Sequence, residues 1–67
     1  MVQAKLKDLK QGEYFTRKPN EYPTDKQVLV RGEYDRTSKR YSCLHFDDIN
    51  NEILLKGETL VYTDFTF

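Results

Sequence analysis

Residues 27–46 read QVLVRGEYDRTSKRYSCLHF, and this stretch decides the fold expected for the chain. Two segments rich in β-branched, aliphatic and aromatic residues, 27–34 and 40–46, flank the polar connector 35–39. Two such runs joined by a short polar connector are typical of antiparallel strands in a β-hairpin. The sequence therefore predicts a hairpin at its centre.

The segments on both sides of this hairpin also indicate short strands. Apolar and polar residues alternate near each end of the chain, which is the period of a half-buried strand. The further strands expected are residues 2–7, 13–17, 52–55 and 59–67. No window shows an apolar stripe at helical spacing over three turns, so little or no helix is expected.

Turns and one longer loop separate these strands. We expect turns at 8–12, where Gly12 is suited to a positive φ, at 47–51 and at 56–58. Residues 18–26 contain two prolines, which prevent regular strand pairing, so this segment is expected to be the longest loop.

The order of these elements favours one architecture. Five or six short strands at spacings of roughly 10 residues predict a small barrel or sandwich. Only five residues separate the third and fourth full strands, where an OB-fold places a helix. We therefore expect residues 1–67 to form a single all-β domain, a five-stranded SH3-like barrel with meander topology.

A resemblance supports this expectation. Residues 6–15, LKDLKQGEYF, resemble the opening L-x-D-L-x-x-G-x-x-F of small SH3-like barrel proteins found in bacterial mobile elements and phages. Residues 28–36, 41–43 and 55–62 are similar to that group as well. The matching positions are turn glycines and core apolar residues, so the resemblance implies the barrel and no activity.

Length and charge narrow the function. A chain of 67 residues is too short to enclose a buried cofactor with its supporting shell, so we expect no enzyme activity and no cofactor. Eleven basic and eleven acidic residues give zero net charge, which argues against bulk binding of nucleic acid or an anionic membrane. The polar composition admits disorder, but 13% aromatic residues favour a folded domain.

The sequence also suggests a compartment. The single Cys43 cannot form an intrachain disulfide, whereas small secreted domains usually depend on several. No segment approaches the ~18 apolar residues that cross a bilayer, and the N-terminal residues lack the apolar region of a secretory signal. We therefore expect a cytoplasmic protein without membrane contact.

Strand alternation predicts a core and a second apolar face. The core set shares strand faces and comprises Val28, Val30, Gly32, Tyr41, Cys43, His45, Val61, Thr63 and Phe65, with Leu6, Phe15, Ile53 and Leu55 added. Four apolar residues fall on the opposite faces: Leu29, Leu44, Leu60 and Tyr62. Because a contiguous exposed apolar patch marks an interface, these four predict a protein-binding or self-association surface. A small binding or assembly module is the leading functional hypothesis.

The alternative hypothesis is nucleic-acid binding by the hairpin. Basic groups interleaved with aromatic rings can follow phosphates and stack on bases. The candidate residues are Arg31, Tyr34, Arg36, Lys39, Arg40 and Tyr41, and Lys5, Lys7 and Lys10 can extend them into a basic face. The competing interpretation is a solvated hairpin in which Glu33 and Asp35 pair with the arginines, each pair contributing about 0–1 kcal/mol.

Catalytic and metal chemistry have weaker signals. Cys43 and His45 stand two apart on one strand, as an activated thiol and its base would, but nothing supplies an oxyanion site. Structural zinc needs four Cys or His ligands, and the chain has one of each. Asp47, Asp48 and Glu52 lack the spacing of a calcium loop, so no metal is expected.

Related barrels bind two further types of ligand. Binding of proline-rich peptides uses an aromatic groove with a Trp, which this chain lacks. A methyl-lysine cage requires several converging rings. Tyr22, Tyr34, Tyr41 and Tyr62 would form one only if the fold brought them together.

Overall fold

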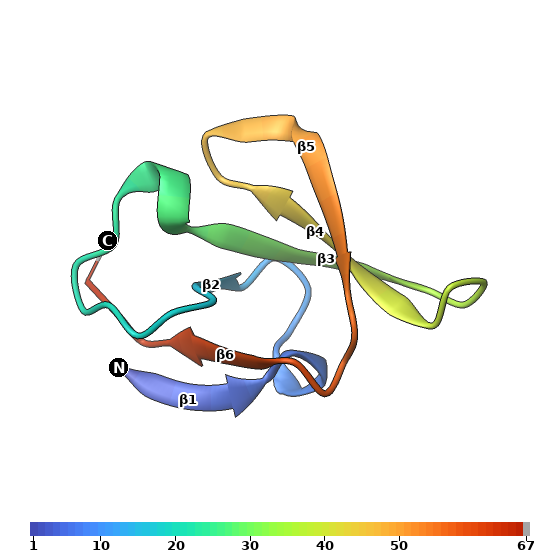
Figure 1. The fold of residues 1–67 in the computed structure, drawn as a ribbon, viewed down its shortest axis with the longest axis horizontal. Coiled ribbons are helices and arrows are strands. Elements are labelled where there is room, and N and C mark those ends of the chain that lie inside the picture. Colours follow the sequence, from blue (N-terminus) through green and yellow to red (C-terminus); the bar gives the residue numbers. More distant parts are fainter. Residues whose placement is uncertain (67) are drawn as a thin grey trace.

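The central hairpin forms as the sequence predicts. In the computed structural model, which describes residues 1–66 except for the side chain of Ile49, β3 (Leu29–Asp35) pairs antiparallel with β4 (Arg40–His45). β2 (Tyr14–Phe15) adds to β3, and β5 (Asp48–Leu55) adds to β4. The result is a four-stranded antiparallel sheet in the order β2-β3-β4-β5, whose hairpin tip projects from the molecule (Figure 1).

A second, two-stranded sheet packs against the first. β1 (Val2–Lys5) pairs antiparallel with β6 (Leu60–Thr63). Thr16 and Tyr62 each donate a backbone hydrogen bond to the other at 2.9 Å, which ties β6 to the chain leaving β2. The all-β prediction is confirmed, but the two sheets are not closed and do not confirm a five-stranded barrel. The predicted meander holds within the four-stranded sheet and is wrong for β1, which pairs with β6 instead of β2.

Two differences from the predicted strand boundaries lie in β5 and β6. β5 begins at Asp48, inside the predicted turn, and the Asn50 amide donates to Asp48 Oδ1 at 3.1 Å. The local Asp and Asn bonding therefore forms an irregularity within β5, where the register to β4 shifts, rather than a separate turn. β6 ends at Thr63 because Asp64 has a left-handed φ of 59°, and predicted strand residue Phe67 lies outside the described residues.

Two short 3₁₀ turns are the helical elements of the described residues. η1 (Leu6–Asp8) replaces the end of the first predicted strand, and η2 (Asp25–Gln27) closes the proline-containing loop. In the described part of the chain, no helix has the length and apolar character needed to cross a membrane.

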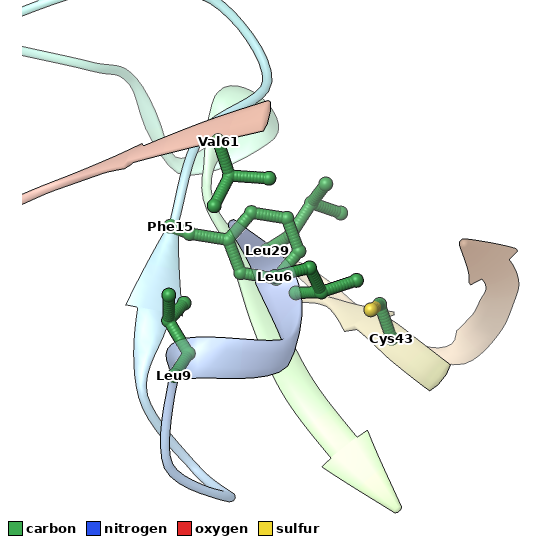
Figure 2. Close-up of a cluster of buried hydrophobic side chains, with 6 residues drawn as sticks. All are labelled: Leu6, Leu9, Phe15, Leu29, Cys43 and Val61. Atoms are coloured by element: carbon green, nitrogen blue, oxygen red, sulfur yellow. The ribbon is translucent and has the colours of Figure 1, made fainter. Parts of the chain in front are cut away.

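The core lies between the two sheets. Its side chains are at most 5% exposed and point toward one another from η1 and its following residue and from β2, β3, β4 and β6 (Figure 2). They are Leu6, Leu9, Phe15, Leu29, Cys43 and Val61. Five elements contribute one core residue each, and partly buried residues of β1 and β5 pack against this cluster, so each short strand depends on tertiary packing rather than on its own pairing.

The predicted core face is right for Val28, which is fully buried just before β3, and wrong for the residues of β3 that follow it. Leu29 pairs with His45 and Arg31 pairs with Cys43, and directly opposed residues share a face. Leu29 is therefore in the core at 4% exposure, whereas Val30, opposite Leu44, faces outward. Residues 28–30 are apolar without interruption, so their pattern contains no alternation from which the face can be read.

Two glycines explain local geometry. Gly12 has a φ of +89°, as predicted for the turn before β2. Gly32 lies where the β3 register shifts, between Arg31 and Tyr34, and a Cβ there would stand 2.3 Å from the Ser42 carbonyl oxygen. This bulge turns Tyr34 to the same face as Tyr41, which is opposite it on β4.

Candidate functional site

The hairpin tip and the turn between β5 and β6 border a shallow hollow of about 520 Å³, here called the hairpin hollow. It is lined by Lys7, Tyr34, Ser38, Lys39, Arg40, Tyr41, Lys56, Gly57 and Glu58. Backbone hydrogen bonds from Leu6 to Thr59 and from Lys7 to Gly57, both 3.0 Å long, bring η1 to this turn. The hollow therefore combines three segments that are distant in sequence.

Two tyrosine rings form the aromatic part of the hairpin hollow. The centroids of Tyr34 and Tyr41 are 5.0 Å apart, and their planes are inclined by 59°. Tyr34 is 47% exposed, whereas Tyr41 is half-buried and packs against the hydrophobic core. Tyr34 is thus the ring accessible to a ligand, and Tyr41 supports it.

Arg31 contacts the ring of Tyr41 and does not line the hairpin hollow. Its guanidinium carbon lies 4.2 Å from the centroid of Tyr41, a cation–π contact. Its Nη1 donates to the Gly32 carbonyl at 2.9 Å, and within the described residues its buried Nε has no hydrogen-bond partner. Arg31 therefore positions Tyr41, which differs from the predicted role as a surface contact.

Four cationic side chains and one carboxylate line the hairpin hollow. Lys39 and Arg40 come from the hairpin, Lys7 from η1 and Lys56 from the turn after β5. Glu58 accepts from Lys7 Nζ at 2.7 Å and pairs with Lys5 Nζ at 3.0 Å. The bond from Lys7 is the largest cause that lowers the pKa of Glu58, and the bond from Lys5 lowers it further. The same carboxylate raises the pKa of Lys7. The hairpin hollow is therefore net positive.

The remaining predicted hairpin cation lies elsewhere. Arg36 lines a cavity on the outer face of the sheet together with Glu33, Asp35 and Glu52. Tyr34 lies between the two sites and lines both this cavity and the hairpin hollow. The ion pairs among residues 1–66 both involve Glu58, so the predicted pairing of Glu33 and Asp35 with arginines is absent there. Asp35 instead accepts from the Thr37 amide at 2.9 Å.

The structure thus brings together four of the six predicted residues, Tyr34, Lys39, Arg40 and Tyr41. Sequence reasoning missed Lys56 and Glu58. Both lie in a turn whose local sequence indicates only a reversal of the chain, and their proximity to the hairpin is a tertiary feature. Lys7 was expected, with Lys5 and Lys10, to extend the hairpin cations into a basic face, and it is the one of these three that lines the hollow.

The predicted protein interface does not form a single patch. Leu29 is buried, which contradicts its assignment to an exposed face. Leu44 lies on the four-stranded sheet opposite Val30 and Glu52. Leu60 and Tyr62 lie on the two-stranded sheet, on the face opposite the buried Val61.

The Cys43 and His45 pair does not present a reactive thiol. Cys43 is fully buried, and burial raises the pKa of its thiol above the ordinary value of 9.0. His45 Nδ1 donates to the Asn51 carbonyl at 2.8 Å, so the imidazole is oriented by β5. In the portion of the chain that the structure describes, no three His, Cys, Asp or Glu side chains gather as a metal site requires.

The other predicted rings do not converge with the hairpin hollow. Tyr22 is 70% exposed on the proline-containing loop, and the hydroxyl of Tyr62 accepts from Gln3 Nε2 at 3.3 Å on the two-stranded sheet. Neither residue lines the hollow, so only two of the four tyrosines meet there. Comparison of the chain with protein-family models, curated proteins and solved structures gives no match.

Proposed function

We propose that the protein is a non-enzymatic binding module whose hairpin hollow binds single-stranded nucleic acid. One observation carries this proposal: the exposed Tyr34 ring, supported by Tyr41, stands among the cations that line the hollow. Proteins that bind single strands combine aromatic rings for base stacking with a positively charged groove for the backbone.

The proposed binding is weak and tolerant of sequence. Stacking one base on Tyr34 contributes about 1–3 kcal/mol, and every base offers a π face. Three of the four cations in the hairpin hollow are lysines, which contact phosphates as point charges. A single strand is preferred over a duplex because the bases of a duplex are already stacked within the helix.

Zero net charge does not oppose this function. The Debye length is about 8 Å at physiological ionic strength. The molecule extends 34 × 24 × 16 Å, so charge on one face acts mainly on a ligand at that face. The carboxylates of Glu33, Asp35 and Glu52 line the outer cavity rather than the hairpin hollow.

The architecture supports the proposal as well. The four-stranded sheet is a meander, and the Thr16 and Tyr62 hydrogen bonds join it to the sheet of β1 and β6. This arrangement is compatible with an open form of the SH3-like barrel. A relationship to the barrel proteins of bacterial mobile elements and phages stays a prediction.

An amide-shift titration of the protein with a single-stranded oligothymidine and a matched duplex tests the proposal. We expect the oligothymidine to shift Tyr34, Lys39, Arg40 and Lys56, with smaller shifts from the duplex and a marked loss of binding at high salt. Shifts that are absent, insensitive to salt or centred on Arg36 would exclude the proposal.

Protein–protein contact through the outer face of the four-stranded sheet is the second candidate. Tyr14, Phe46 and Leu54 are 44%, 37% and 39% exposed, and the Tyr14 and Phe46 rings meet at 5.6 Å. Half-buried Val30 and Leu44 lie on the same face. Sedimentation equilibrium at increasing concentration tests self-association, and a species that stays monomeric in both the parent and Leu54→Lys would exclude it.

A further inference from the structure

A second cavity, here called the loop pocket, lies away from the hairpin tip. It has a volume of about 390 Å³ and is lined by Thr16, Arg17, Lys18, Asn20, Lys26, Gln27, Leu29, His45 and Ile53. Leu29 and His45 pair at one end of the β3–β4 ladder, whereas Tyr34 and Tyr41 pair near the other end. The η2 segment beside this pocket lies at the end of the molecule opposite the hairpin tip (Figure 1).

The wall of the loop pocket is an ordered loop. Thr16 is 2% exposed, and its Oγ1 donates to the Lys18 carbonyl at 2.8 Å. Gln27 Oε1 accepts from the Asn20 side-chain amide and from the Thr24 backbone amide, each at 3.0 Å. These bonds link both ends of the proline-containing segment, so the loop holds its side chains around the pocket.

The charges of the loop pocket are all of one sign. Arg17, Lys18 and Lys26 line it, and no lining residue carries a carboxylate. None of these three cations forms an ion pair within residues 1–66. The hairpin hollow, by contrast, contains Glu58, which already engages Lys7. An anion that enters the loop pocket therefore meets cations that are not paired with any carboxylate of the described residues.

The floor of the loop pocket is apolar. Leu29 is 4% exposed and belongs to the core, and half-buried Ile53 packs against that core. Ligand pockets commonly pair such an apolar surface with a few polar groups that orient the ligand, in volumes of roughly 300–1,000 Å³. The guanidinium of Arg17 can bind two oxygens of a phosphate or carboxylate at once.

We propose that the loop pocket binds a small organic anion, a phosphate or carboxylate carried on one compact apolar group. The anionic group lies among Arg17, Lys18 and Lys26, and the apolar group covers Leu29 and Ile53. This site is separate from the hairpin hollow and does not depend on the function proposed for it.

The test is an amide-shift titration of the full chain with phenyl phosphate and with benzoate. Inorganic phosphate and phenol serve as controls that carry only one of the two chemical features. We expect saturable shifts at Arg17, Lys18, Lys26 and Gln27, with affinity at least about tenfold higher for an organic anion than for either control. The stronger of the two organic anions identifies phosphate or carboxylate as the preferred group.

Variants separate a site from general charge attraction. Arg17→Gln and Lys26→Gln should each weaken binding about fivefold or more, whereas Lys10→Gln, which removes an exposed cation outside the pocket, should not. Equal affinity for inorganic phosphate and phenyl phosphate, absence of saturable shifts, or unchanged binding in Arg17→Gln and Lys26→Gln would overturn the proposal. Shifts at Tyr34 without shifts at Arg17 would also overturn it while leaving the hairpin hollow intact as an anion site.

Discussion

The ring of Tyr34 lies against the ring of Tyr41, with their centroids 5.0 Å apart, because the β-bulge at Gly32 places both residues on one face of the hairpin. Tyr41 is in turn held by Arg31, whose guanidinium carbon lies 4.2 Å from its centroid. An exposed ring on a fixed support loses little conformational entropy when a base stacks on it. This relationship links the backbone irregularity of β3 to the proposed function.

Lys39→Gly should separate stability from binding. Lys39 has a left-handed φ of 58°, which costs a residue with a side chain roughly 1 kcal/mol and costs glycine little. We expect the variant to be as stable as the parent or more stable in urea denaturation, yet to bind oligothymidine more weakly because a cation is lost. Lys39→Gln is the matched control, with weaker binding and no gain in stability. An unchanged affinity for oligothymidine in both variants would show that its phosphates do not bind at Lys39.

Gly32→Ala should destabilise the hairpin. The added Cβ would stand 2.3 Å from the Ser42 carbonyl oxygen, so β3 and β4 must separate, at a cost of about 1–3 kcal/mol. Gly12→Ala tests a different cause of destabilisation, because Gly12 has a φ of +89° and an added Cβ there would meet no atom within 4 Å. Urea denaturation compares the two, and only Gly32→Ala should also disturb the amide shifts of Tyr34 and Tyr41. Native-like shifts of those tyrosines in Gly32→Ala would contradict the role assigned to the bulge.

Glu58→Gln should strengthen nucleic-acid binding. The carboxylate engages Lys5 and Lys7, and its removal leaves both cations available for phosphates. We expect a higher affinity for oligothymidine and a steeper dependence on salt, measured by fluorescence anisotropy at several salt concentrations. Lower affinity in Glu58→Gln would mean that the ion pairs organise the hairpin hollow instead of competing with the ligand.

The pH dependence of Glu58 follows from the same bonds. Its pKa is lowered in the folded state by Lys7 and Lys5 from an ordinary value of 4.5. Its contribution to stability is therefore complete above that ordinary value and is lost as pH falls through the folded-state pKa. The Glu58→Gln variant should lack this part of the loss of stability at low pH.

Cys43 should be unreactive in the folded protein and sensitive to high pH. Its thiol is fully buried, so a disulfide reagent should modify it at least about 100-fold more slowly than in urea. Because burial raises its folded-state pKa above 9.0, its contribution to stability is complete below pH 9.0 and is lost as pH rises toward the folded value. Cys43→Ala should remove that part of the loss of stability at high pH. Rapid modification without denaturant would contradict the burial of Cys43.

The sequence predicts the fold best where local pattern and turn chemistry agree. The hairpin is predictable because a polar connector separates two apolar runs, and the positive φ of Gly12 is predictable from the turn before β2. The face of Leu29 was not predictable, since residues 28–30 are all apolar and the bulge at Gly32 sets the register. The bulge itself depends on how closely β4 approaches β3, which no local pattern encodes.

The candidate site was predicted in part for the same reason. Tyr34, Lys39, Arg40 and Tyr41 are close in sequence, so their grouping is visible in the hairpin. Lys56, Lys7 and Glu58 join them only through the hydrogen bonds between η1 and the turn before β6. The loop pocket was also hidden, because the proline-containing segment has no strand or helix pattern and its order comes from side-chain bonds such as that between Asn20 and Gln27.

The affinity of Tyr34→Ala for oligothymidine at low salt tests the central claim most directly. Tyr34 is 47% exposed, so the variant should keep the fold, which a circular dichroism melt checks. Loss of one stacked base predicts binding weaker by about fivefold or more, with Tyr34→Phe close to the parent and Arg36→Gln, outside the hairpin hollow, only slightly affected. Equal affinities for the parent and Tyr34→Ala would contradict the account.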